Sequence, residues 1–293
     1  PGWRVYSFSR LIGGAGLFTA AAGGDDEAPD APRAEEEGAA GPELALRGPA
    51  FGTAFHEILE QADFAAWPPP GTGLDAARRE AVAAPLRRAG VALPEAEAER
   101  ERLLEAVGER VACTLHTPLP GIGPLAGIPP ERRLVEMEFF LGLDGGRLAG
   151  LVEALEAAGY AAALPAERRA ETLRGLMHGF IDLVVEHGGR YYVVDYKTND
   201  LGAAPEAYAP PRLERAMAHG HYPLQYLIYL VALHRHLGRS LPGYTPEAHL
   251  GGAYYLFVRG MTGADEGSGV YADTPPAARI RALDRLFAGE GGA

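Results

Sequence analysis

Two short β-rich runs separated by a pair of glycines constrain the fold of this chain more than any other feature. The runs cover residues 179–187 and 190–197, and Gly188-Gly189 lies between them. Runs rich in Val, Ile and Tyr on either side of a two-residue glycine turn are typical of a tight β-hairpin. A two-residue turn also fixes which residues of the two strands face one another.

The hairpin carries three charged side chains, Asp182, Asp195 and Lys197. Asp182 lies as far before the turn as Asp195 lies after it, which predicts that they face one another with about 5 Å between their Cβ atoms. Residues two apart on a strand share a face, so Lys197 joins Asp195 there. Facing carboxylates among Val, Ile and Tyr repel one another unless a cation lies between them. The pattern predicts a divalent metal site; the alternative is a set of surface ion pairs.

Oxygen ligands of this kind suit Mg²⁺, with Mn²⁺ as an alternative. Such an ion polarises a phosphoryl oxygen and lowers the pKa of a bound water. Lys197 could orient or deprotonate that water and offset the negative charge that builds up on the phosphate. The hairpin therefore indicates phosphate chemistry.

Three residues on predicted helices extend the candidate site. His56 could complete a carboxylate metal site, or be an ordinary, partly buried histidine. Gln225 and Tyr229 are four residues apart, so their amide and phenol project from one helical face and could contact a phosphodiester. The alternative for Tyr229 is packing in the core with its hydroxyl at the rim.

The other segments alternate between helical and strand patterns. We expect a helix from Phe51, a helical region at 75–113 broken near Pro94, a strand at 133–141, a helix within 213–237 and a strand at 252–258. Together with the hairpin, this order predicts an α/β fold. Its central mixed sheet would be flanked by helices, with a helical insertion before the first strand.

Residues 23–43 depart from this pattern. They combine Gly, Pro, Ala and acids without apolar periodicity, and residues 24–43 contribute seven of the twelve net negative charges of the chain. We expect a disordered acidic insert within a single domain that covers residues 1–293. The overall charge argues against binding of nucleic acid by bulk charge, although a local basic groove is compatible with it.

A single cysteine, Cys113, limits the chemistry available to the chain. It excludes an intrachain disulfide, a zinc site of four cysteines and a cysteine-held iron–sulfur cluster, and it fits a reducing cytoplasm. No apolar run reaches the roughly 18 residues of a membrane span, and no export signal is visible. These features predict a cytoplasmic protein. Because the sequence begins with Pro1, we also expect it to be a piece of a longer protein.

Five short stretches spread over the chain resemble a known family. They are WRVYSFS at 3–9, GTAFHEILE at 52–60, GFIDLVVEHGGRYYVVDYKTN at 179–199, QYLIY at 225–229 and YYLFVRGM at 254–261. Together they resemble the PD-(D/E)xK nucleases, which have a restriction-endonuclease-like core. Within that superfamily they resemble the C-terminal nuclease domains of exodeoxyribonuclease V beta subunits, the RecB family. With its single cysteine, the chain differs from the iron–sulfur relatives, in which four cysteines clamp the domain.

The resemblance implies a Mg²⁺-dependent DNA nuclease that cuts strands fed to it by the helicase motor of the same polypeptide. His56, Asp182 and Asp195 resemble the metal ligands of the family, joined by the main-chain carbonyl of Tyr196.

The resemblance also suggests roles for residues around the metal. Lys197 resembles the catalytic lysine, and Gln225 and Tyr229 resemble a Gln-x3-Tyr helix that supports substrate and site geometry. Glu136 or Glu138 would be the additional acid on the first core strand, and the sequence does not distinguish them.

Partners and context follow from the same resemblance. It implies DNA as single strand or unwound duplex, RecC-like gamma and RecD-like alpha subunits, and the RecA recombinase. The pathway would be repair of double-strand breaks by homologous recombination, with the ATP site in another part of the longer chain. A DNA-delivering channel formed by partner subunits would also explain why the domain itself is acidic.

Alternatives remain for the chain and for some residues. The domain could be an inactive nuclease-fold platform that docks partner subunits or RecA, or a phosphohydrolase, although no G-x-x-x-x-G-K-[ST] phosphate loop occurs. The acidic insert could be a plug that mimics DNA. Arg259 could face DNA or cap the last strand. Four histidines are interpreted as ordinary surface or helix-end residues: His219, His221, His234 and His236.

Overall fold

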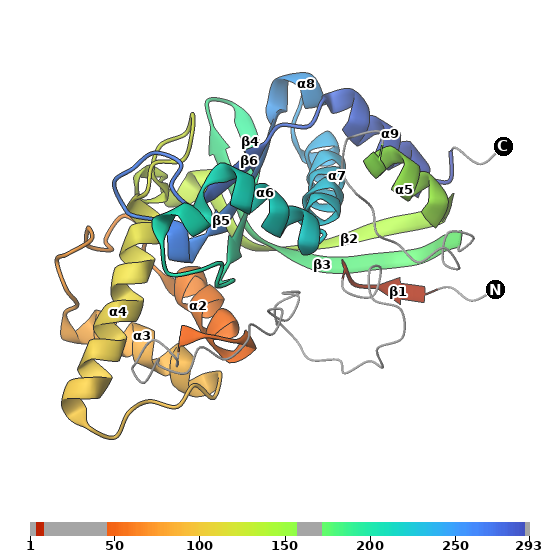
Figure 1. The fold of residues 1–293 in the computed structure, drawn as a ribbon. Helices are drawn as coiled ribbons and strands as arrows, with labels where there is room; N and C mark the ends of the chain where they lie inside the picture. The colour runs from red at the N-terminus through yellow and green to blue at the C-terminus, as the bar shows by residue number, and fades with distance from the viewer. Residues whose placement is uncertain (1–3, 9–45, 157–171, 291–293) are drawn as a thin grey trace.

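The computed structural model of the chain describes residues 4–8, 46–156 and 172–290 (Figure 1). Within these ranges, six strands form one mixed sheet. They are β1 Arg4–Tyr6, β2 Arg133–Arg147, β3 Thr172–His187, β4 Arg190–Lys197, β5 Leu250–Phe257 and β6 Val270–Asp273. The predicted α/β class with a central mixed sheet is confirmed.

β3 changes neighbours along its length. On one edge it pairs antiparallel with β2 over nearly its whole length. On the other edge its first part pairs parallel with β1, and its last part pairs antiparallel with β4. β4 then runs parallel to β5, and β6 pairs antiparallel with β5. Between the stretches that pair with β1 and β4 lies a short part of β3 that, among the described residues, pairs with β2 only.

The predicted hairpin is confirmed. His187 pairs with Arg190, and the turn residues Gly188 and Gly189 have φ angles of 60° and 77°. Two consecutive positive φ angles match the twist of the flanking strands, and glycine adopts them without steric cost.

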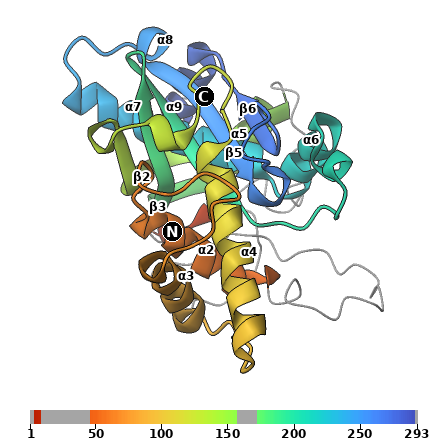
Figure 2. The ribbon, with the colours of Figure 1, turned by 90° about the vertical axis from the view of Figure 1, so that its left-hand side faces the viewer.

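Helices cover both faces of the sheet (Figures 1 and 2). On one face lie α2 Pro49–Gln61, α3 Ala76–Arg88 and α4 Glu97–His116, whose apolar residues form one core cluster. On the other face, α5 Leu148–Glu156, α6 Pro210–His219, α7 Tyr222–Ser240 and α9 Ala277–Phe287 contribute to a second cluster, and α8 Pro246–His249 is a short connection. The predicted helical region at 75–113 and its break near Pro94 correspond to α3 and α4.

The helix predicted in the second half of 213–237 is confirmed as α7, and the first half of the segment belongs to a separate helix, α6. His221 has a left-handed backbone with φ 55°, and Pro223 lies in the first turn of α7. Proline cannot donate the amide bond that a continuous helix needs, but it fits a first turn well. The chain therefore ends one helix and begins another at Gly220-His221.

Strand boundaries also differ from the predictions. β2 and β3 extend beyond 133–141 and 179–187, because they pair with one another through a glycine-rich stretch that has little apolar signal. β5 covers Leu250–Phe257 rather than 252–258. β1 and β6 were not predicted, since three or four residues are too few to show alternation.

Two further sequence predictions concern the acidic insert and membrane spans. The acidic insert at 23–43 lies outside the described residues. Among the helices that the structure describes, none is both long and apolar enough to cross a bilayer.

Candidate functional site

The candidate site lies where β3 and β4 separate. The predicted register is confirmed up to Leu183 and Val194, the pair farthest from the turn. Asp182 and Asp195 follow directly after this pair, as β4 continues beside β5. The Asp182 carboxylate bridges the point of separation, because its Oδ2 accepts a hydrogen bond of 2.9 Å from the backbone N–H of Tyr196.

Asp195 and Lys197 form a buried ion pair on β4. The distance from Lys197 Nζ to Asp195 Oδ2 is 2.7 Å, and both residues are only 2% exposed. The lysine ammonium also lies over the rings of Tyr222 and Tyr255, at 4.3 and 5.4 Å from their centroids. Aromatic faces attract a desolvated cation, so these rings help to hold the lysine in the protein interior.

The pKa values of the two carboxyl groups shift in opposite directions. Burial raises the pKa of Asp195 to about 7, with a contribution from the Asp182 charge, although Lys197 opposes the shift. For Asp182, burial also acts to raise the pKa. The charge and hydrogen bond of His56, the charge of Lys197 and the Tyr196 N–H outweigh burial, so the Asp182 pKa is lowered. The positive charge near Asp182 thus outweighs the effect of burial on its pKa, whereas the charge of Lys197 does not outweigh the effect of burial on the pKa of Asp195.

His56 reaches the site from α2, on the opposite face of the sheet from α7. Its Nδ1 lies 3.4 Å from Asp182 Oδ2, and its ring stands edge-on to the Tyr196 ring at 5.8 Å. The helix forms there because its buried face, including Phe55 and Leu59, packs against the sheet. The predicted proximity of His56 to the hairpin acids therefore holds for Asp182.

Gln225 and Tyr229 lie on α7, and they bond to each other. Gln225 Nε2 donates to the Tyr229 hydroxyl at 3.0 Å, and Gln225 Oε1 accepts from the Tyr255 hydroxyl at 2.8 Å. Both ends of a buried amide are satisfied in this way, which fixes its orientation. The chain Tyr255–Gln225–Tyr229 links β5 to α7 beside the lysine.

The predicted metal ligands form two contacts rather than one cluster. His56 contacts Asp182, and Lys197 contacts Asp195, and among the described residues no three His, Cys, Asp or Glu side chains form a group that could hold an ion. The donor chemistry nevertheless fits Mg²⁺ or Mn²⁺, since two carboxylates and an imidazole are available. A cation there would also offset the charge that raises the pKa of Asp195.

The register of β2 distinguishes the two candidate acids of the first long strand. Glu136 lies between the pairs Val135–Leu183 and Met137–Ile181, which is the position opposite Asp182. Its charge contributes to the raised pKa of Tyr196, so it lies near the site. Glu138 instead accepts a bond of 2.9 Å from His178 Nε2. Of the two acids, Glu136 is therefore the one that lies opposite Asp182.

Arg259 and His234 have structural contacts. Arg259 Nε donates to the Thr198 carbonyl at 2.7 Å, and its guanidinium lies over the Phe51 ring. It therefore ties the end of β4 to α2. His234 Nδ1 lies 2.8 Å from the Tyr244 hydroxyl.

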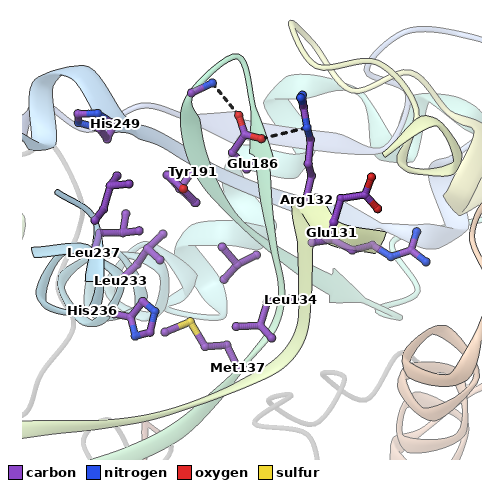
Figure 3. Close-up of a pocket in the computed structure, with 14 residues that line it drawn as sticks. Glu131, Arg132, Leu134, Met137, Glu186, Tyr191, Leu233, His236, Leu237 and His249 are labelled. Carbon is purple, nitrogen blue, oxygen red and sulfur yellow. Dashed lines mark hydrogen bonds and ion pairs between the residues drawn. The ribbon is translucent and has the colours of Figure 1, made fainter. Parts of the chain in front are cut away.

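A separate cavity of about 440 Å³ opens near the hairpin turn, away from Lys197 (Figure 3). His236 lies at its edge together with His249 and Tyr191, around an apolar floor that includes Leu134 and Leu237. None of the predicted site residues lines this cavity.

Two residues near the lysine were missed by the sequence analysis. Tyr222 and Tyr255 contact the Lys197 ammonium, and Tyr222 also donates to Asn199 Oδ1 at 3.2 Å. Each lies in an apolar run, where a tyrosine is usually a core residue. The parallel pairing of β4 with β5 could have indicated Tyr255, since it lies opposite Asp195.

Comparison with known families agrees with this architecture. A model of the PD-(D/E)XK nuclease superfamily matches residues 33–290, so the chain belongs to this superfamily.

Among individual proteins, the chain is similar to the RecBCD enzyme subunit RecB of several bacteria. It is 37% identical to RecB of Mycobacterium tuberculosis H37Rv over 325 aligned positions, which cover 97% of this chain and 28% of that protein. For Mycolicibacterium smegmatis the identity is 35%, covering 91% and 26%. For Escherichia coli K12 it is 37%, covering 62% and 16%. The chain spans less than a third of the length of these relatives.

Proposed function

We propose that the chain is a metal-dependent DNA nuclease domain of the RecBCD type, which hydrolyses phosphodiester bonds. The observation that carries this proposal is the buried contact between Asp195 and Lys197, with Asp182 beside it where β3 and β4 separate. An ion pair in the protein interior is costly to desolvate, and replacing it with apolar residues often leaves a protein equally stable or more stable. Its position in a site with perturbed carboxyl pKa values supports a catalytic role.

The chain's own residues divide into two groups in this proposal. His56, Asp182, Asp195 and the main-chain carbonyl of Tyr196 would hold Mg²⁺, or Mn²⁺ in its place, with Glu136 as an additional acid near Asp182. The bound ion would polarise the phosphoryl oxygen and favour ionisation of the attacking water.

Lys197 is the proposed catalytic residue. It orients the water that attacks phosphorus and offsets the negative charge on the phosphate as the ester P–O bond breaks. Gln225 and Tyr229 are positioned to fix the surroundings of this lysine through Tyr255, whose ring lies near the ammonium. The attacking water loses its proton, and the oxygen released from the ester gains one.

The wider context is proposed from the RecB relatives. Residues 1–293 would be one nuclease domain of a longer helicase–nuclease that binds ATP elsewhere. It would act in the cytoplasm on single-stranded or unwound DNA, with RecC-like and RecD-like subunits and with RecA, in double-strand break repair. The match of residues 33–290 to the nuclease superfamily supports assignment to the nuclease portion of such a protein.

The experiment is cleavage of a labelled single-stranded oligonucleotide by the chain with Mg²⁺, with Mn²⁺ and with EDTA. Asp195→Ala is the test variant, and Asp144→Ala is the matched control, because Asp144 is an exposed carboxylate on β2. Calorimetry measures metal binding to all three proteins. We expect metal-dependent cleavage by the parent and the control, and neither cleavage nor metal binding by Asp195→Ala.

Two outcomes would contradict this proposal. A parent chain that binds neither ion would favour the alternative of an inactive platform for partner subunits or RecA. Cleavage that persists in Asp195→Ala would move the catalytic centre away from the hairpin. A parent that binds metal but does not cut would show that catalysis needs parts of the longer protein.

A further inference from the structure

Three rings lie in contact on an open part of the sheet. Phe140 on β2 is stacked on His178 of β3, with 4.6 Å between ring centroids and 10° between ring planes. The His178 ring in turn meets Phe180 edge-on at 5.3 Å. Phe140 is 59% exposed and Phe180 is 38% exposed. We call Phe140, His178 and Phe180 the aromatic ladder.

The ladder lies on the face of the sheet that α2, α3 and α4 cover only in part. These helices gather beside one end of β2 and β3, and the two strands run on past them (Figure 1). The intervening residue Ile181 is buried in the core on the α7 side, as is Met177. Since neighbouring strand residues point to opposite faces, the ladder residues of β3 point away from that core.

The ladder leads directly to the candidate site. His178 and Phe180 are alternate residues of one strand and share a face, about 7 Å apart along it, and Asp182 lies two residues further on, where His56 of α2 contacts it on the same side of the sheet. Asp182 is the residue that contacts His56 and the Tyr196 N–H. An extended ligand that lies along the ladder would therefore continue directly into the candidate site at Asp182.

The chemistry of this face suits bases rather than phosphates. Glu138 lies beside the ladder, with its carboxylate bonded to His178 and half exposed, and it would repel a phosphate. Flat exposed rings instead stack on nucleobases, and this stacking does not depend on base sequence. Bases can stack on a protein surface only when they are free of a partner strand, which specifies a single strand.

We propose that the aromatic ladder is a stacking surface for the bases of single-stranded DNA on its way to the hairpin site. This inference rests on the proposed nuclease function and adds the surface along which the single strand reaches the site. The bases face the ladder, and the phosphates point toward solvent until the strand reaches Asp182.

The test compares two probes in EDTA, so that binding is measured without cleavage. One is a fluorescent oligothymidylate, and the other is an abasic oligonucleotide of the same length and charge. We expect the parent chain to bind the thymidylate at least about fivefold more tightly, since stacking of one base contributes about 1–3 kcal/mol. In Phe140→Leu/Phe180→Leu this ratio falls toward one, at low and at high salt alike, because stacking involves no counterion release.

Two controls separate stacking from damage to the fold. Phe140→Trp keeps an aromatic plane and should keep the ratio. Leu134→Ala removes another exposed apolar side chain of β2 that lines the separate cavity, and it should also leave the ratio unchanged. Leucine at both ring positions retains apolar volume, so the double variant should fold, which circular dichroism verifies.

The outcomes distinguish failure of this inference from failure of the proposed function. If the parent bound the two probes equally, or if the double leucine variant kept the preference of the parent for thymidylate, the proposed stacking on the ladder would be wrong. Hydrolysis of bis(p-nitrophenyl) phosphate with Mg²⁺ reports on the hairpin site alone, because this ester is too small to span the ladder. We expect equal hydrolysis by the parent and the double variant. Absence of hydrolysis in the parent would count against the nuclease function. The ratio of thymidylate to abasic binding would still test whether the aromatic ladder stacks on bases.

Discussion

The two sides of the candidate site differ in how fully they are enclosed. On the α7 side, Lys197 and Gln225 are 2% exposed and Tyr255 is fully buried. On the α2 side, the side chains of His56 and Asp182 are 15% and 14% exposed, and the aromatic ladder continues outward from them. On the α7 side, Lys197 pairs with Asp195, and Gln225 bonds to Tyr229 and Tyr255, so these polar groups contact one another inside the protein. Under the proposed function, a metal or a DNA strand would enter from the α2 side.

This difference separates effects on stability from effects on binding. A change on the enclosed side leaves a buried polar group without its partner, so it should lower both stability and activity. A change on the open side meets solvent, so it should lower activity with little effect on stability. Four measurements test this division, in order of decreasing expected effect.

The largest effect is expected from Lys197→Met. The proposed catalytic group is lost, so cleavage should fall by roughly 10²–10⁴-fold. The Asp195 carboxylate would also be left buried without its cation, which lowers the free energy of unfolding by about 3–5 kcal/mol. Cleavage assays and urea unfolding measure the two quantities. Adding Asp195→Asn to this variant should restore much of the stability but none of the cleavage. If Lys197→Met alone stayed as stable as the parent, the α7 side would not be enclosed as described.

His56→Asn, on the open side, should separate activity from stability. Loss of one proposed ligand should weaken Mg²⁺ binding and cleavage by roughly 10–100-fold, as for other changes next to a metal. The free energy of unfolding should change by less than about 1 kcal/mol, because the side chain remains partly in solvent. Calorimetry and urea unfolding check this, with Gln61→Ala on the same helix as the control. A large loss of stability would mean that His56 belongs to the enclosed network.

Tyr255→Phe should have the reverse effect. It removes the donor to Gln225 Oε1 and leaves a buried carbonyl without that bond, which lowers the free energy of unfolding by about 1–3 kcal/mol. The ring under Lys197 is retained, so cleavage should fall less than tenfold. Tyr254→Phe on the same strand is the matched control, since that hydroxyl bonds to the Pro120 carbonyl away from the site. Equal loss of cleavage in both variants would show that Tyr255 has no special link to the lysine.

The sequence predicted the hairpin, the fold class and the proximity of Lys197 to Asp195, because glycine turns and strand alternation are local signals. The contact of His56 with Asp182 joins residues far apart in the chain, so the residues alone left an ordinary histidine as the alternative, and the resemblance to a family suggested the ligand. The choice between Glu136 and Glu138 needed the register of β2 against β3, which alternation alone does not fix. Tyr222 and Tyr255 could not be distinguished from core tyrosines without knowing that they surround an ammonium. The aromatic ladder likewise depends on which part of the sheet the helices leave open.

The smallest effect concerns how far the enclosed side extends along α7. Burial lowers the pKa of His234 below its usual 6.5, as do the nearby Arg281 and Arg235 charges, although Asp284 opposes the shift. Below about pH 6.5 the unfolded chain therefore binds a proton that the folded chain resists, so stability should decrease as the pH falls through this window. In His234→Gln this decrease should be shallower, with a difference below about 1 kcal/mol between pH 7.5 and pH 5.5. Urea unfolding at the two pH values measures it. If the free energy of unfolding changed equally with pH in parent and variant, folding would not oppose protonation of His234. The enclosed side would then not extend along α7 from Tyr229 as far as His234.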